Sequence, residues 1–140
     1  MNLKDLFPNL TEQNHNVTSP RTVDYNCVAW AAGDSNRWWQ PGIYWPIPST
    51  KDGCGIGELV LAFESLGYES CDDGSLESGF EKIALYAIGM MYTHVARQLA
   101  NGSWTSKLGQ LEDIQHDSPA VIEGSDYGEV LQFMKRALIT

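Results

Sequence analysis

The sequence is short of positive charge. Its 140 residues contain nine lysines and arginines against 18 aspartates and glutamates, so the formal net charge is -9. Surfaces that bind DNA, RNA or anionic membranes need clustered lysine and arginine, and the nine basic residues here are scattered along the chain. The composition therefore argues against nucleic acids and membrane surfaces as partners.

Long apolar runs are also missing. No segment approaches the roughly 18 apolar residues that a membrane-spanning helix requires. The start, MNLKDLFPNLTEQN, lacks the basic region and apolar core of a secretory signal. We expect the protein to be made in the cytoplasm, with export that needs no signal peptide as the alternative.

Cysteine and histidine are scarce, with three of each. Cys27, Cys54 and Cys71 are far apart and form no Cys-x-x-Cys pair, which argues against a disulfide framework and a structural zinc site. The phosphate loop, the dinucleotide fingerprint, His-Glu-x-x-His and Gly-x-Ser-x-Gly are all absent. We expect no metal and no cofactor, and the enzyme chemistry that remains is that of a thiol.

The first half of the chain contains two helical patterns. Residues 26–32 begin at Asn26, a good capping residue, and stop before Gly33. Residues 55–66 repeat apolar side chains at the spacing of an amphipathic helix. Residues 1–22 are polar, contain two prolines, and are predicted to form an irregular arm.

The second half is strand-like. The segments EKIALYAIG, MYTHVARQL and SWTSKL alternate, and Asn101-Gly102 predicts a two-residue hairpin turn that would set His94 opposite Gly109. The last segment, EVLQFMKRAL, fits a helix or a final strand. This order predicts one α+β domain over residues 1–140, with N-terminal helices packed on a small antiparallel sheet.

Cys27 is the candidate nucleophile. A cysteine nucleophile needs a lowered pKa and a base, and the start of a helix favours the thiolate. His94 opens a strand, a rigid place from which to direct an imidazole. His116, in a polar loop, is the rival base, and His15 in the arm is expected to be solvated. The alternative for Cys27 is an inert, buried core residue.

A catalytic imidazole also needs an acceptor for its second nitrogen. Asp113 follows the second arm of the hairpin and would supply a charged acceptor. Ser106, on that arm, would supply an uncharged one. Tyr25 and Asn26, just before the cysteine, are expected to contact substrate or to contribute an N–H group to an oxyanion hole.

This layout resembles papain-like cysteine hydrolases, most closely the NlpC-type and CHAP-type amidases and endopeptidases. The resemblance covers roughly residues 20–116 and rests on Cys27 at a helix start and His94 at a strand start. It implies a papain-like fold and a third site residue at Ser106, where that family more often has His, Asn, Asp or Glu. The segments YNCVAWAAG, THVARQLANGSWTSKLG and DIQH also resemble a group of small bacterial proteins of uncharacterised activity.

The loop after the first helix is rich in aromatic residues. They either pack as a loop that covers the core or form a cleft wall that stacks on peptide or sugar faces. These residues are Trp38, Trp39, Tyr44 and Trp45.

The leading hypothesis is a cysteine-dependent amide hydrolase, that is, an amidase, peptidase or deamidase. The resemblance implies a peptide or peptidoglycan-like amide as substrate, with a protein partner or inhibitor as a further expectation. The first alternative is a non-catalytic papain-like module that binds through its tryptophan-rich loop. The second is an immunity or toxin-partner protein, suggested by small size and acidity.

Overall fold

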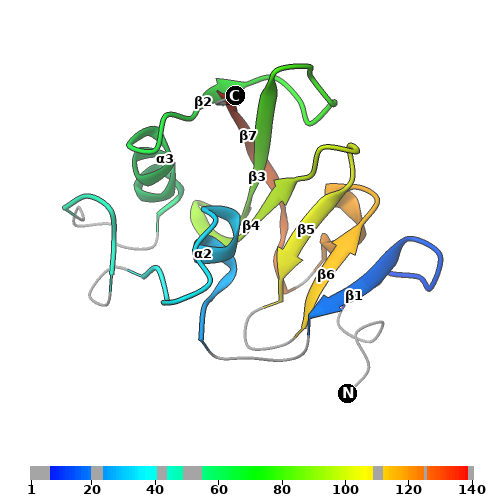
Figure 1. The fold of residues 1–140 in the computed structure, drawn as a ribbon. Coiled ribbons are helices and arrows are strands. Elements are labelled where there is room, and N and C mark those ends of the chain that lie inside the picture. Colours follow the sequence, from blue (N-terminus) through cyan, green and yellow to red (C-terminus); the bar gives the residue numbers. More distant parts are fainter. Residues whose placement is uncertain are drawn as a thin grey trace.

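The computed structural model describes residues 7–19, 24–40, 44–48, 55–108, 112–124 and 126–138. Its main feature is a seven-stranded sheet with the order β1-β6-β5-β4-β3-β7-β2 (Figure 1). Every neighbouring pair is antiparallel. The strands are β1 (His15–Ser19), β2 (Glu69–Cys71), β3 (Phe80–Ile88), β4 (Met91–Gln98), β5 (Trp104–Lys107), β6 (Asp113–His116) and β7 (Glu129–Ala137).

The helical elements are short. Among the described residues they are α2 (Cys27–Ala31), α3 (Ile56–Glu64) and the 3-10 helix η1 (Pro119–Ile122). The expectation of helices packed on a small papain-like or NlpC-like sheet is therefore wrong, because the sheet is the dominant element. Across the described ranges, no helix has the length and apolar character needed to cross a membrane.

Two segments make the sheet larger than expected. Within the supposed irregular arm, His15–Ser19 forms β1 and pairs with β6. The C-terminal segment forms β7, which pairs with both β3 and β2. Both pairings join segments that are far apart in the sequence, so local patterns do not reveal them.

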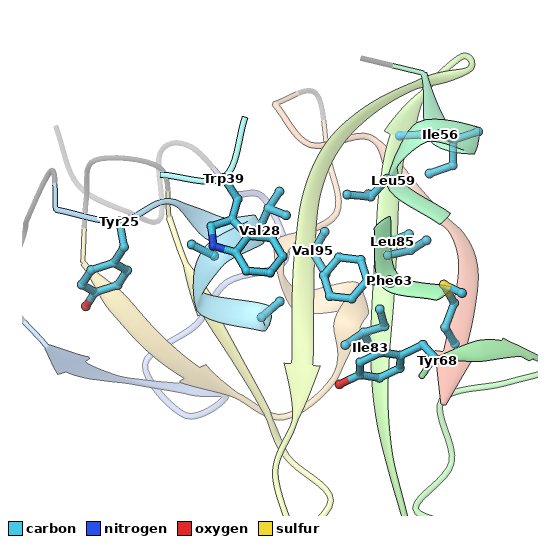
Figure 2. Packing of buried hydrophobic residues seen from close by; sticks show 14 residues of the cluster. Tyr25, Val28, Trp39, Ile56, Leu59, Phe63, Tyr68, Ile83, Leu85 and Val95 are labelled. Carbon is cyan, nitrogen blue, oxygen red and sulfur yellow. The ribbon is translucent and has the colours of Figure 1, made fainter. Parts of the chain in front are cut away.

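The helices cover one face of the sheet. Val28 of α2 and Phe63 of α3 are directed onto β4 on either side of Val95 (Figure 2). Alternate strand residues face the other way and form a second apolar cluster with the N-terminal segment and η1. That cluster includes Phe7, Leu10, Ala84, Tyr86, Ala96, Trp104, Ile114 and Ile122.

The β4–β5 hairpin has a longer turn than the sequence predicts. The N–H group of Leu99 donates to the carbonyl of Ser103 at 2.7 Å, and Gly102 has a φ of +90°. The Asn101 carboxamide accepts from the Ser103 N–H at 3.0 Å, which stabilises this three-residue loop. The register consequently moves by one residue from the predicted one, and Arg97 pairs with Thr105.

The two strands of this hairpin then separate. Among the described residues, β4 and β5 pair only at Arg97–Thr105 and Gln98–Trp104. Helix α2 contacts both strands, and Trp30 Nε1 donates to Thr105 Oγ1 at 3.0 Å. The helix that begins at Cys27 is thereby fixed over the opening between β4 and β5.

Candidate functional site

Asn26 holds the start of α2 in place. Its Oδ1 accepts from the N–H groups of Ala29 at 3.1 Å and Trp39 at 3.0 Å, and its Nδ2 donates to the Trp39 carbonyl at 2.9 Å. The side chain caps the helix and ties it to the aromatic loop. The structure thus shows a structural use for a residue that the sequence suggested for substrate binding.

Asn26→Ala should destabilise the protein by about 1–2 kcal/mol, because it removes a helix cap in a buried position. Asn26→Ser keeps an oxygen at the cap and should lose less. Urea unfolding measures both free energies. Equal losses in the two variants would show that the cap oxygen does not stabilise α2.

The Cys27 sulfur is partly buried where α2 meets the sheet. The backbone N–H groups of Val95, Val28 and Cys27 face it, and the charge of Lys107 also favours a thiolate. Burial outweighs them and raises the pKa of the Cys27 thiol to about 11. The expectation of a lowered pKa is therefore wrong, and Cys27 is a neutral thiol at pH 7.

The contact with Val95 places the sulfur at the opening of the sheet. A strand N–H lies in the plane of the sheet and points toward a neighbouring strand. At Val95 it points toward Cys27, in the region where β5 has left the ladder. The Cys27 sulfur thus contacts the residue that follows His94 on β4. No hydrogen bond joins the side chains of Cys27 and His94 in the described structure.

His94 is fully buried on the face opposite α2. Its ring stacks on Tyr127 with centroids 4.3 Å apart, and it meets the edge of Tyr86 at 5.2 Å. Burial, with the nearby His116 as a second cause, lowers the pKa of His94 well below its usual value. The imidazole is neutral in the resting protein.

Ser106 links His94 to His116. Its Oγ lies 3.0 Å from His94 Nε2 and 2.8 Å from His116 Nε2, and His116 Nδ1 lies 2.8 Å from the Ser118 carbonyl oxygen. His94, Ser106 and His116 are almost completely buried, and this row of hydrogen bonds ends at the partly buried Ser118. The sequence treated His116 as a rival of His94, whereas the structure places both on one hydroxyl.

The direction of each bond follows from the Ser118 carbonyl, which can only accept. His116 Nδ1 must carry the hydrogen, so the Nε2 of the neutral ring accepts from the Ser106 hydroxyl. The Ser106 oxygen then accepts from His94 Nε2–H. The Nδ1 of His94 is left as a bare lone pair, which is buried and has no hydrogen-bond partner in the part of the chain that the structure describes.

Asp113 does not reach His94. It pairs across the β5–β6 ladder with Lys107 on the other face of the sheet, and its Oδ2 accepts from the Tyr25 hydroxyl at 2.5 Å. Burial, followed by this hydrogen bond, raises the pKa of Tyr25 to about 12. Of the two acceptors proposed for His94, the structure brings only Ser106 into contact.

Sequence reasoning missed Lys107 and Tyr127. Lys107 alternates with Ser106 on β5, so the strand pattern places it on the face of α2, near Cys27. That alternation was a usable signal. Tyr127 lies in the turn just before β7, and nothing in the sequence points to its stacking on His94.

The aromatic loop packs against the core. Trp39 is buried and its Nε1 donates to Asp34 at 2.9 Å. Tyr44 meets Trp39 edge-on, and Trp45 stacks on Tyr92. Trp38 is half-buried. Trp39, Tyr44 and Trp45 thus pack as expected of a loop that covers the core. Cys54 lies outside the described residues.

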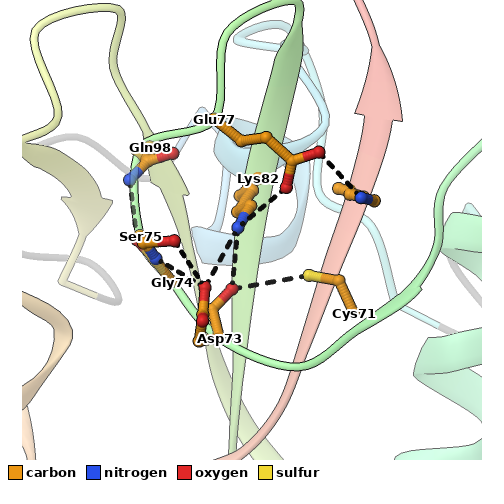
Figure 3. A network of polar contacts seen from close by, with 8 residues as sticks. Cys71, Asp73, Gly74, Ser75, Glu77, Lys82 and Gln98 are labelled. Atoms are coloured by element: carbon orange, nitrogen blue, oxygen red, sulfur yellow. Dashed lines mark hydrogen bonds and ion pairs between the residues drawn. The ribbon is translucent and has the colours of Figure 1, made fainter.

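A second polar cluster surrounds the buried Lys82. Its Nζ contacts Asp73 at 3.3 Å and Glu77 at 3.5 Å, while Lys135 contacts Glu77 at 2.8 Å (Figure 3). The half-buried Cys71 donates to the Asp73 carbonyl at 3.5 Å. These charges are balanced within the cluster, which anchors the acidic turn to the sheet.

Two cavities of about 660 and 650 Å³ are lined by neither Cys27 nor His94. Among the described residues, no group of three or more His, Cys, Asp or Glu side chains is placed to hold a metal ion. The candidate chemistry therefore rests on the hydrogen-bonded row of His94, Ser106 and His116.

Comparison with known proteins gives one informative match. A family model described as domain of unknown function (DUF7689) matches residues 16–135. The matched region contains Cys27, His94, Ser106 and His116. No curated protein and no solved structure matches the chain.

Proposed function

This chain belongs to the DUF7689 family, and we propose that it is a cysteine-dependent hydrolase of amide bonds. Cys27 is the nucleophile and His94 the general base. The observation that carries the proposal is the bare Nδ1 of His94, a buried acceptor that has no donor among the described residues. Leaving such a group unpaired costs about 1–3 kcal/mol, and a proton from the reaction would satisfy it.

The neutral thiol determines the order of events. Because the pKa of Cys27 is raised to about 11, its proton must leave as the sulfur attacks the carbonyl carbon. Nδ1 of His94 receives that proton, and the carbonyl oxygen becomes an oxyanion near the N–H groups that face the sulfur. The same proton then goes to the leaving amine, which gives a thioester at Cys27.

Water completes the cycle. His94 Nδ1 takes a proton from a water molecule as its oxygen attacks the thioester carbonyl. The carbon–sulfur bond breaks, the proton returns to the sulfur, and the carboxylic acid product leaves. His94 is neutral before and after each half of the reaction, in keeping with its burial.

The substrate in this proposal is a peptide amide, in a protein or in a peptidoglycan-like crosslink. Cys27 and Cys71 are free thiols, which fits a reducing compartment. We therefore include cytoplasmic action in the proposal, and this favours a protein substrate over the cell wall.

An activated ester, p-nitrophenyl acetate, tests the nucleophile without knowledge of the substrate. At pH 7.5 we expect acetylation of the peptide that contains Cys27, detected by mass spectrometry. Cys27→Ala should abolish it, and His94→Gln should slow it by about 100-fold or more. Circular dichroism checks that both variants are folded.

Cys71→Ser is the matched control, because Cys71 is a second partly buried thiol with a pKa that burial raises. This variant should acetylate at the wild-type rate. Equal labelling of Cys71 and Cys27, or a Cys27 rate that does not depend on His94, would overturn the proposal.

A further inference from the structure

We propose that His116 is the positioning residue of His94 and the place where the proton of the reaction comes to rest, delivered through the Ser106 hydroxyl. This inference rests on the proposed function, because it concerns the proton that His94 takes from Cys27. The geometry behind it stands independently of that function.

The geometry is that of a proton relay. Ser106 Oγ is within hydrogen-bond distance of both imidazoles, 3.0 Å from His94 Nε2 and 2.8 Å from His116 Nε2. A hydroxyl has one hydrogen and two lone pairs, so it accepts from one ring and donates to the other. All three side chains lie on the same face of the sheet and are buried.

The proton transfer balances at every atom. The Cys27 thiol proton goes to Nδ1 of His94, while the Nε2 proton of His94 moves to Ser106 Oγ. The hydroxyl proton of Ser106 moves to Nε2 of His116. The products are a sulfur bonded to the acyl carbon, a negative charge on the former carbonyl oxygen, a neutral His94 with its hydrogen on Nδ1, an unchanged serine and an imidazolium at His116.

The surroundings of His94 do not favour a positive charge. The groups facing it are Tyr86 from β3, Tyr127 from the loop before β7, Ser106 from β5 and His116 from β6. Both burial and His116 disfavour its protonation. A charge on this ring would lie between two aromatic rings in the core.

His116 offers better support for that charge. Its Nδ1–H donates to the Ser118 carbonyl, and the carboxylate of Asp117 favours the imidazolium, while His15 on β1 opposes it. Burial lowers the pKa of His116 to about 4, so the ring is neutral at rest and ready to accept. The charge is therefore transient and is used only while the sulfur is attacking.

Two substitutions at His116 separate its two roles. In His116→Gln, a side-chain oxygen still accepts from Ser106, so the hydrogen-bond direction is kept, but no proton can be stored. In His116→Leu, the Ser106 hydroxyl loses its acceptor and should donate to His94 Nε2 instead. His94 would then carry its hydrogen on Nδ1.

Nitrogen NMR of protein with ¹⁵N-labelled histidine gives the direct readout. At pH 7 the wild type should show His94 with its hydrogen on Nε2 and His116 with its hydrogen on Nδ1. His116→Gln should keep the His94 tautomer, and His116→Leu should change it. A His94 signal that is the same in the wild type and in His116→Leu would overturn the relay, as would a wild-type His94 with its hydrogen on Nδ1.

Acetylation of Cys27 by p-nitrophenyl acetate tests the transfer itself. His116→Gln and Ser106→Ala should each slow it by about tenfold or more, and Ser106→Thr, which keeps the hydroxyl, should retain more activity than Ser106→Ala. A wild-type rate in His116→Gln would overturn the role of His116 while leaving Cys27 as nucleophile. Absence of acetylation in the wild type would instead overturn the proposed function, and the tautomers would still test the hydrogen-bond row.

Discussion

Gly128→Ala should destabilise the protein by about 3 kcal/mol or more. A Cβ at this position would lie 2.1 Å from the backbone oxygen of Ala87, and φ is +70°. Backbone atoms cannot move aside as the end of a flexible side chain can. Gly128 also forms a narrow bridge with Gly124, with N–H to carbonyl distances of 3.0 and 2.7 Å, so the turn cannot shift without losing both bonds.

Gly33→Ala is the matched control. Gly33 also has a positive φ, +86°, but its added Cβ would meet no atom of the described residues within 4 Å. The loss of stability in Gly33→Ala should be limited to the cost of the left-handed backbone, about 1–2 kcal/mol. Urea unfolding compares the two variants. Similar losses would show that Gly128 and Ala87 do not approach closely.

The substitution at Gly128 also bears on the candidate site. Tyr127 precedes Gly128 and stacks on His94, with centroids 4.3 Å apart. A displaced turn would carry this ring away from the imidazole. If Gly128→Ala remains folded, its His94 signals should differ from those of the wild type, whereas those of Gly33→Ala should not.

The sequence predicts the elements that depend on local patterns. Helix α2 begins beside its capping residue Asn26, and α3, Ile56–Glu64, lies within the predicted residues 55–66. The three central strands also lie where alternation places them. Each of these signals comes from residues that are neighbours in the chain.

The fold class could not be predicted in the same way. Strand β1 pairs with β6, and β7 pairs with β3, over long stretches of intervening chain. The β4–β5 register differs by one residue, because the Asn101 side chain and the positive φ of Gly102 form a three-residue loop. The predicted hairpin has a two-residue turn and the observed one a three-residue loop. These two turn types are close in energy, so the sequence alone does not decide between them.

In the candidate site too, some positions could be predicted from local patterns and others depend on tertiary packing. The sequence placed Ser106 on the second arm of the hairpin that begins with His94, and the structure has Ser106 Oγ 3.0 Å from His94 Nε2. Asp113 was expected at the same edge, but it lies on the opposite face. His116 looked like a loop residue, because β6 shows itself as a strand only through its partners. The pKa of Cys27 was expected to fall and instead rises, because burial of the sulfur depends on tertiary packing.

The free energy of unfolding should fall steeply as the pH is lowered from about 6.5 to 4, since buried neutral histidines protonate more readily in the unfolded chain. The folded-state pKa of His116 is lowered from 6.5 to about 4. Its contribution is therefore fully present above the unfolded pKa and is lost as the pH falls to the folded one. The difference corresponds to about 3 kcal/mol, and the lowered pKa of His94 acts in the same direction.

His116→Gln separates this histidine contribution from the acid titration of carboxylates. Asp73, whose pKa is lowered to about 2, mainly by its hydrogen bonds with Ser75, loses its contribution only below about pH 4. Between pH 6.5 and 4 the wild type should lose more stability than the glutamine variant, which cannot titrate at position 116. Urea unfolding across this range measures both slopes. Parallel slopes would mean that His116 titrates normally in the folded protein, and the buried hydrogen-bond row would then not hold it neutral.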